Sequence, residues 1–167
     1  MEETSERGAI NKGMRTLWLI WAAMLGSLLI YIFICHQLGE GFKSAEESDV
    51  PIDLLRNIFF GVAAAELIMS YYLRRFMLKG RLSAVIRSSP LNQPPFVGQY
   101  TAAVIISIAL SESIGIYGLV LFVLGGGFKI LYTFIVVSAL AMVFYRPKRE
   151  ELERLAMAYK QASEISH

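Results

Sequence analysis

The chain has 167 residues, of which 55% are hydrophobic, and its mean hydropathy is +0.50. It is more apolar than an ordinary soluble domain, and its apolar residues fall in long blocks, as in membrane proteins. The formal net charge of +2 gives no argument for a nucleic-acid partner, and the single cysteine, Cys35, excludes an internal disulfide.

The first apolar block, 16–38, follows a polar segment of mixed charge, residues 1–15. The block is about twice as long as the apolar core of a signal peptide, so we expect a retained span rather than a cleaved leader. Trp18, Trp21 and Tyr31 are typical of side chains that anchor a span at the membrane interface.

The second apolar block, 57–73, has 17 residues, which is short for a span. We expect its helix to continue to about residue 79, with Arg74 and Arg75 extending their charged ends toward the headgroups. Pro51 is expected in the first turn of this helix. A basic connection with several prolines follows, and it excludes a continuous helix into the next block.

The third block, 96–124, and the fourth, 128–145, are separated by three glycines, Gly125 to Gly127, which predict a tight turn. The remaining segment, 146–167, predicts a charged helix opened by Pro147.

That last helix carries Leu152, Leu155 and Tyr159 on one stripe by helical spacing. We expect it to lie on the membrane or on its own bundle. The alternative is that it binds a partner.

Lysine and arginine gather near the two termini and in the loop between the second and third spans, whereas Lys43 and Lys129 stand almost alone on the other side. The positive-inside rule therefore predicts cytoplasmic N- and C-termini. The expected fold is an all-α membrane protein of a prokaryotic inner membrane, with four transmembrane helices (16–145) and a short cytoplasmic C-terminal helix.

Two glutamates interrupt the apolar blocks, Glu66 in the second and Glu112 in the third. An ionised carboxylate at the bilayer centre costs at least about 2.5 kcal/mol, so such a residue is a candidate functional site. Ala109 and Gly115 share the face of Glu112 by helical spacing, and small residues there allow another helix to approach.

Ser113 and Tyr117 add hydroxyl groups close to Glu112. Carboxylate and hydroxyl oxygens suit a hard cation such as Na⁺, and a desolvated carboxyl group also favours its protonated form. If the second and third spans pack as a hairpin, Glu66 could face Glu112 and share one proton or cation with it. The alternative is that one or both carboxyl groups are simply protonated and form hydrogen bonds within the bundle.

The segment 109–124 resembles the second helix of the c subunit of rotary ATP synthases, especially of its sodium-binding members. The resemblance implies that Glu112 carries the ion, that Ser113 is a ligand, and that Tyr117 locks the carboxylate with a hydrogen bond. It also places Glu66 where sodium-binding members have a further ligand. The matching residues are Ala109, Glu112, Ser113, Gly115, Ile116, Tyr117, Leu119 and Val120.

The resemblance covers a central hairpin, about residues 57–124. Gln93 and Pro94 stand where the family has its polar cytoplasmic loop, but Asn92 replaces the family's arginine. The second block contains one glycine, Gly61, where the family has a dense glycine repeat. The first and fourth blocks lack a carboxylate, so the sequence gives no sign of an internal duplication.

We therefore expect a protein that binds or translocates H⁺ or Na⁺ through Glu112, as a homo-oligomer or as a subunit of a membrane complex. The alternative is a non-catalytic accessory subunit of a larger membrane complex. A third hypothesis is a small secondary transporter that uses the two carboxylates, Glu66 and Glu112, as its coupling site. Besides the lipid bilayer, a cytoplasmic partner could bind the basic loop 74–95 and the tail 146–162. No enzyme activity, cofactor or metal is expected beyond Na⁺ at Glu112, because the chain has neither an HExxH nor a CxxC motif.

Overall fold

The computed structural model describes residues 2–39, 51–78 and 95–165, and these ranges contain helices and no strand. The expected all-helical class is therefore confirmed. In chain order the elements are α1 (Glu2–Leu38), α2 (Ile52–Leu78), α3 (Pro95–Leu121), the π-helical turn η2 (Phe122–Gly126), α4 (Gly127–Phe144) and α5 (Arg149–Ile165).

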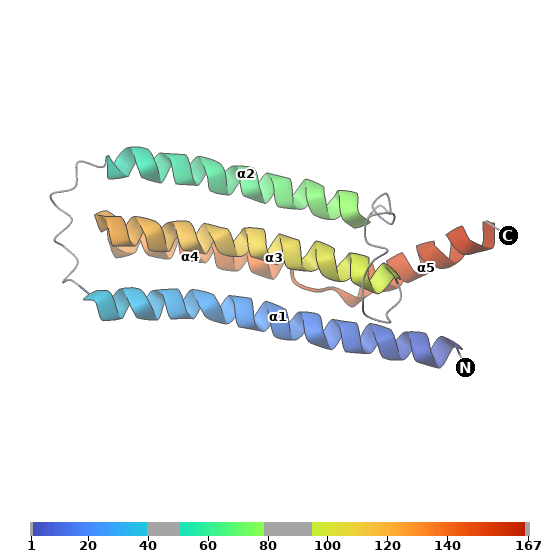
Figure 1. Cartoon of the computed structure of the whole chain (residues 1–167). Helices are drawn as coiled ribbons and strands as arrows, with labels where there is room; N and C mark the ends of the chain where they lie inside the picture. The colour runs from blue at the N-terminus through green and yellow to red at the C-terminus, as the bar shows by residue number, and fades with distance from the viewer. Residues whose placement is uncertain (1, 40–50, 79–94, 166–167) are drawn as a thin grey trace.

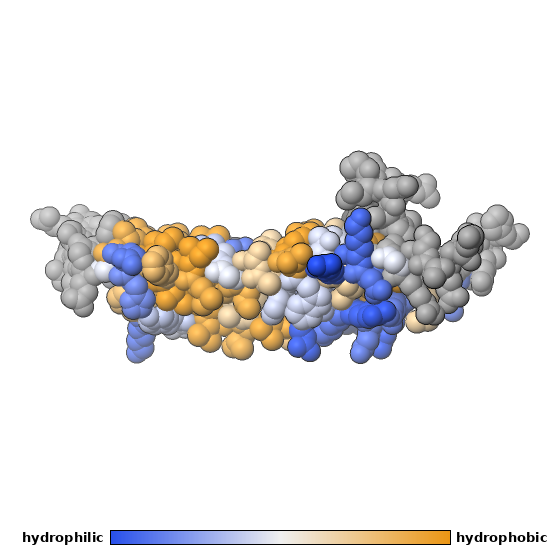
Figure 2. All heavy atoms as spheres, turned by 90° about the horizontal axis from the view of Figure 1, so that it is seen from below, coloured by the Kyte–Doolittle hydropathy of each residue, from blue (hydrophilic) through white to orange (hydrophobic). Residues whose placement is uncertain are grey.

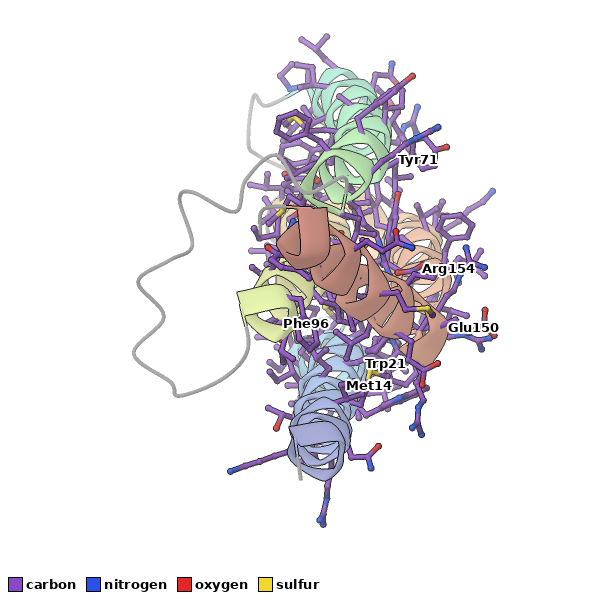
Figure 3. All side chains as sticks on the ribbon, turned by 90° about the vertical axis from the view of Figure 1, so that its right-hand side faces the viewer. Met14, Trp21, Tyr71, Phe96, Glu150 and Arg154 are labelled. Carbon is purple, nitrogen blue, oxygen red and sulfur yellow. The ribbon has the colours of Figure 1, made fainter. Side chains whose placement is uncertain are left out.

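The four long helices run side by side, with α3 and α4 as a central pair and with α1 and α2 on opposite sides of that pair (Figures 1 and 3). Helix α3 contacts α1, α2 and α4. The described ends of α1 and α5 lie at one end of the bundle, and the turn between α3 and α4 lies at the other (Figure 1). The two termini therefore share one end, as the charge pattern predicts.

Two helices begin earlier than the apolar blocks predict. Helix α1 begins at Glu2, so the described part of segment 1–15 continues the first helix. Helix α2 begins at Ile52, and Pro51 precedes it instead of lying in its first turn, with its carbonyl oxygen 3.1 Å from the amide nitrogen of Leu55. The residues likened to the polar loop of the c subunit, 92–94, lie outside the described residues.

The tight turn predicted from the three glycines is confirmed. Gly125 has φ 97° and Gly127 has φ 72°, in the left-handed region that residues with a Cβ rarely occupy. Because the chain reverses there, α3 and α4 pack along each other, and an apolar stretch of 49 residues forms two helices.

The main core lies where α1, α3 and α4 meet, and it includes Leu28, Ile108, Leu131 and Met142. A smaller cluster joins α2 to the central pair and contains Ala63, Ile114, Leu121 and Phe134. Neither cluster encloses the outer faces of α1 and α2.

Large apolar side chains cover those outer faces. On α1, Leu29 is 69% exposed, and on α2, Ile68 is 60% exposed. Figure 2 shows the apolar surface on the α1 side, with hydrophilic residues gathered toward the ends of the molecule. Among the described residues, two stretches are long and apolar enough to cross a membrane: 10–38 and 96–144.

Helix α5 packs on the bundle with its apolar stripe, as the sequence predicts. Leu152 and Leu155 are buried in the main core cluster, and Tyr159 packs against it. The Tyr159 hydroxyl also lies 2.8 Å from the side-chain oxygen of Gln99, in the first turns of α3.

Arg74 does not extend toward the headgroups, contrary to the prediction. Its side chain is 9% exposed and lies 2.7 Å from the carboxylate of Glu151 in α5. It also donates a hydrogen bond to the carbonyl oxygen of Tyr145, at 2.8 Å. The partner carboxylate is a tertiary contact from the far end of the chain, which local sequence could not reveal. Arg75 remains exposed.

Candidate functional site

Glu66 lies near the middle of α2, at the contact with α3. One of its carboxyl oxygens, Oε2, lies 2.8 Å from the Ser113 hydroxyl. The other, Oε1, lies 2.5 Å from the Tyr117 hydroxyl. Both hydroxyl groups come from α3, one helical turn apart, and the Tyr117 ring stacks on Phe59 of α2 with 5.0 Å between ring centroids.

Glu112 lies on α3 at the contact with α1. Its Oε1 atom is within hydrogen-bond distance of the Ser27 hydroxyl and lies 3.1 Å from the Tyr31 hydroxyl. Tyr31 is therefore a partner of this glutamate inside the bundle, not the interfacial anchor that the sequence suggested. Trp21, nearer the N-terminus of α1, instead donates a hydrogen bond to the Met142 carbonyl oxygen at 2.9 Å.

The four predicted site residues thus divide between two places. Glu66, Ser113 and Tyr117 come together, whereas Glu112 points to another helix. The expectation that Tyr117 locks Glu112 is wrong, because Tyr117 bonds Glu66. The hydroxyl partners of Glu66 and of Glu112 are separate sets, and the sharing of one ion by the two carboxyl groups stays a prediction.

The two sites have the same construction. In each, a serine and a tyrosine four residues later on one helix bond a glutamate on a neighbouring helix. Ser27 and Tyr31 bond Glu112, and Ser113 and Tyr117 bond Glu66. The spacing places the two hydroxyl groups on the same face, one turn apart.

Sequence reasoning missed the pair Ser27 and Tyr31. A signal existed, since these residues repeat the four-residue spacing of Ser113 and Tyr117. A repeat of the carboxylate motif does not reveal them, because α1 contributes hydroxyl groups without a carboxylate.

Each serine hydroxyl has a second acceptor on its own helix. Ser27 Oγ lies 2.7 Å from the Met24 carbonyl oxygen, and Ser113 Oγ lies 2.8 Å from the Leu110 carbonyl oxygen. A hydroxyl group has one proton to donate. When the serine donates its proton to the carboxylate, the ionised glutamate accepts a hydrogen bond. When it donates to the carbonyl oxygen, its own oxygen can accept the proton of a neutral carboxyl group.

The two carboxyl groups differ in one respect. Both oxygens of Glu66 have a hydroxyl partner, whereas at Glu112 both hydroxyl groups contact Oε1. Oε2 of Glu112 has no partner within ranges 2–39, 51–78 and 95–165. That oxygen is therefore available to a proton, a cation or a group from another molecule.

No cation among the described residues neutralises either glutamate. The ion pairs there join Arg56 to Asp53, Arg74 to Glu151, and Arg149 to Glu153. Both glutamates are half-buried. Among the described residues, the partners of the two carboxyl groups are therefore neutral hydroxyl groups.

The small residues predicted beside Glu112 have different environments. A Cβ added at Gly115 would lie 2.6 Å from Leu28 Cδ2 of α1 and 3.3 Å from Ser138 Oγ of α4, so Gly115 does permit a close approach of neighbouring helices. Ala109 is exposed and lines no such contact.

His36 of α1 has a hydrogen-bond partner on α4. Its Nε2 atom lies 2.8 Å from the Tyr132 hydroxyl. Cys35 is buried beside it in the chain. In the part of the chain that the structure describes, no group of three histidine, cysteine, aspartate or glutamate residues could hold a metal ion.

Comparison of the chain with protein-family models, with curated proteins and with solved structures finds no match.

Proposed function

We propose that this protein is embedded in a membrane and reversibly binds a proton, or Na⁺ in its place, at Glu112 and Glu66. The observation that carries the proposal is the partner set of the two glutamates. Each is bonded by a serine and a tyrosine from a neighbouring helix, and no described cation lies against either. Neutral hydroxyl groups can serve both the ionised and the protonated carboxyl group.

Membrane embedding is supported by the apolar outer faces of α1, α2 and α4 and by the two long apolar stretches. Four spans, the cytoplasmic position of the termini and a prokaryotic inner membrane belong to this proposal. In that setting a half-buried glutamate borders hydrocarbon, where a bare charge is costly. A bound proton or cation removes that cost.

Glu112 is the better candidate for exchange, because its Oε2 atom has no described partner. The resemblance to the c subunit also assigns the ion to Glu112, although Ser113 and Tyr117 serve the other glutamate. Glu66 with its two hydroxyl partners offers four oxygen atoms, which suits Na⁺ as well as a proton. Assembly as a homo-oligomer or within a larger membrane complex remains part of the proposal.

A second candidate function is that of an accessory subunit in which both glutamates only join helices. One observation favours it: all four hydroxyl–carboxyl bonds run between helices, two between α1 and α3 and two between α2 and α3. In that case neither carboxyl group would exchange its proton while the bundle is folded.

Carbodiimide labelling distinguishes the two, because carbodiimides react with protonated carboxyl groups in apolar surroundings. The purified protein in detergent is labelled across a pH series, with and without Na⁺, and the modified residues are mapped by mass spectrometry. We expect labelling of Glu112 that fades as pH rises. Protection by Na⁺ would identify the cation as a ligand, and its absence would identify the proton.

Glu112→Gln and Glu66→Gln are the matched controls, since each removes one reactive group and keeps the shape and a hydrogen-bonding side chain. Absence of labelling at both glutamates at every pH, in protein whose helicity is intact, would refute exchange. Failed assembly of both glutamine variants would then support the accessory role.

A further inference from the structure

A groove lies between α2 and the junction of α4 and α5, at the end of the molecule that Figure 3 faces. Its volume of about 340 Å³ falls in the range of roughly 300–1,000 Å³ typical of small-molecule pockets. Tyr71, Leu78 and Phe144 supply apolar surface to its walls. Tyr71 and Phe144 are themselves exposed, so the groove opens to the surroundings.

The groove has more positive than negative charge. Arg74, Arg75 and Lys148 line it together with one carboxylate, Glu151, which leaves an excess of two positive charges (3 − 1). Arg74 is already paired with that carboxylate. Arg75 and Lys148 therefore supply the unneutralised charge.

The side chains of these two cations form few hydrogen bonds with the described residues. Among the described residues, the guanidinium of Arg75 has one hydrogen-bond contact, at 3.4 Å, to the Tyr71 hydroxyl. The ammonium group of Lys148 has no partner in the described ranges, although its backbone nitrogen bonds the Tyr100 hydroxyl at 2.7 Å. Both side chains are exposed at the mouth of the groove.

We infer that the groove binds the phosphate headgroup of an anionic phospholipid, with Arg75 and Lys148 as its ligands and with Tyr71 and Phe144 against the upper part of the acyl chains. The groove stands where the apolar surface of α2 and α4 gives way to the charged helix α5, which is the headgroup level of a membrane that surrounds the apolar band. The inference rests on the proposed membrane embedding and is independent of the chemistry of Glu66 and Glu112.

The test uses the full chain in mixed micelles that contain phosphatidylglycerol and phosphatidylcholine, with the retained lipid counted by native mass spectrometry. The double substitution Arg75→Gln/Lys148→Gln is expected to reduce selective retention of phosphatidylglycerol about thirtyfold, and each single substitution about fivefold, the effect of basic side chains near an anionic headgroup. Inorganic phosphate in excess should not displace the lipid.

The matched control is Arg149→Gln/Arg154→Gln, which removes the same charge from the outer side of α5 and should change retention by less than about twofold. The inference would be overturned if both double variants lost lipid equally, or if Arg75→Gln/Lys148→Gln lost none. Displacement of the lipid by inorganic phosphate would overturn it as well. Release of the protein from membranes by alkaline carbonate would refute membrane embedding itself. The double variant Glu66→Gln/Glu112→Gln should still retain the lipid. Failure of carbodiimide labelling would therefore count against ion binding at the glutamates, and failure of lipid retention would count against the lipid site.

Discussion

At the residue scale, the tyrosine hydroxyl groups adjust the balance between the two forms of each glutamate. A hydroxyl that donates to a carboxylate stabilises the ionised form. Tyr31→Phe removes one such donor from Glu112, so carbodiimide labelling of Glu112 should persist to higher pH. The fraction of Glu112 that is labelled at a fixed high pH should therefore exceed that of the unsubstituted protein.

Tyr117→Phe is the reciprocal test, because its hydroxyl bonds Glu66 at 2.5 Å. It should raise the pH of half-labelling at Glu66 and leave Glu112 unchanged, while Tyr31→Phe does the reverse. A shift at Glu112 caused by Tyr117→Phe would contradict the pairing described for the two sites.

The sequence was sufficient to find both glutamates and one of the two hydroxyl pairs. It could not assign Ser113 and Tyr117 to the correct glutamate. Consecutive residues on a helix point about 100° apart, so Glu112 and Ser113 face different helices. Which neighbour lies on which side depends on the packing of α1 and α2, and local sequence does not encode that.

At the scale of the elements, glycine allows α3 and α4 to pack closely. A Cβ at Gly118 would lie 2.6 Å from Phe134 Cβ and 3.2 Å from the Leu131 carbonyl oxygen, and neither atom belongs to the flexible end of a side chain. Gly118→Ala should therefore push the two helices apart and lower the free energy of unfolding by about 1–3 kcal/mol. Denaturant titration in detergent micelles measures this change.

Gly98→Ala provides the comparison on the same helix. A Cβ there meets no atom of the described residues within 4 Å, so alanine should stabilise the protein by up to about 1 kcal/mol through its helix propensity. If Gly118→Ala destabilised the protein no more than Gly98→Ala does, the α3–α4 contact would be looser than described.

Helix α5 depends on Arg74 for its attachment to α2. Arg74→Gln removes the ion pair with Glu151 and leaves that carboxylate without its buried partner. A hydrogen bond to a charged group contributes about 1.5–3 kcal/mol, so exchange of the α5 amide hydrogens should accelerate about thirtyfold. Hydrogen exchange followed by mass spectrometry reports it peptide by peptide.

Arg75→Gln is the neighbouring control, because the exposed guanidinium has the Tyr71 hydroxyl, at 3.4 Å, as its one hydrogen-bond partner in the described part of the chain. The α5 amide hydrogens of the Arg75→Gln variant should exchange at nearly the same rate as those of the unsubstituted protein. If Arg74→Gln left the exchange of α5 equally slow, the apolar residues Leu152 and Leu155 would be sufficient to attach the helix.

Helix type and order were predictable from apolar blocks, prolines and glycines, whereas the helix ends were not. The polar residues before Thr16 gave no apolar signal, yet α1 extends back to Glu2. A burial pattern marks the packed part of a helix, and a helix can continue beyond its packed part. The burial of Arg74 was likewise not predictable from local sequence, since its partner Glu151 lies 77 residues away.

At the scale of the whole molecule, the bundle has the α3–α4 turn at one end and the charged helix α5 at the other. The proposed cytoplasmic position of the termini can therefore be tested by labelling each end. With Cys35 replaced by alanine, single cysteines at Lys129 and Arg149 report on opposite ends of the bundle, both from exposed positions. In intact cells an impermeant maleimide should label Lys129→Cys. Arg149→Cys should react only after the membrane is permeabilised.

The opposite labelling pattern would reverse the orientation predicted by the positive-inside rule, and labelling of both in intact cells would argue against a membrane between the two ends. The sequence predicted that the termini share one end. It did not predict that α1 and α2 would lie on opposite sides of the central pair, because both blocks are simply apolar and several arrangements of four such helices bury similar surfaces.

The position of α3 between the two glutamate sites has a mechanical consequence. This one helix contributes the carboxyl group to one site, through Glu112, and the hydroxyl groups to the other, through Ser113 and Tyr117. A rotation of α3 about its own axis would therefore separate the partners in both sites at once. Any motion of α3 relative to α1 and α2 would therefore act on the hydrogen bonds of both carboxyl groups.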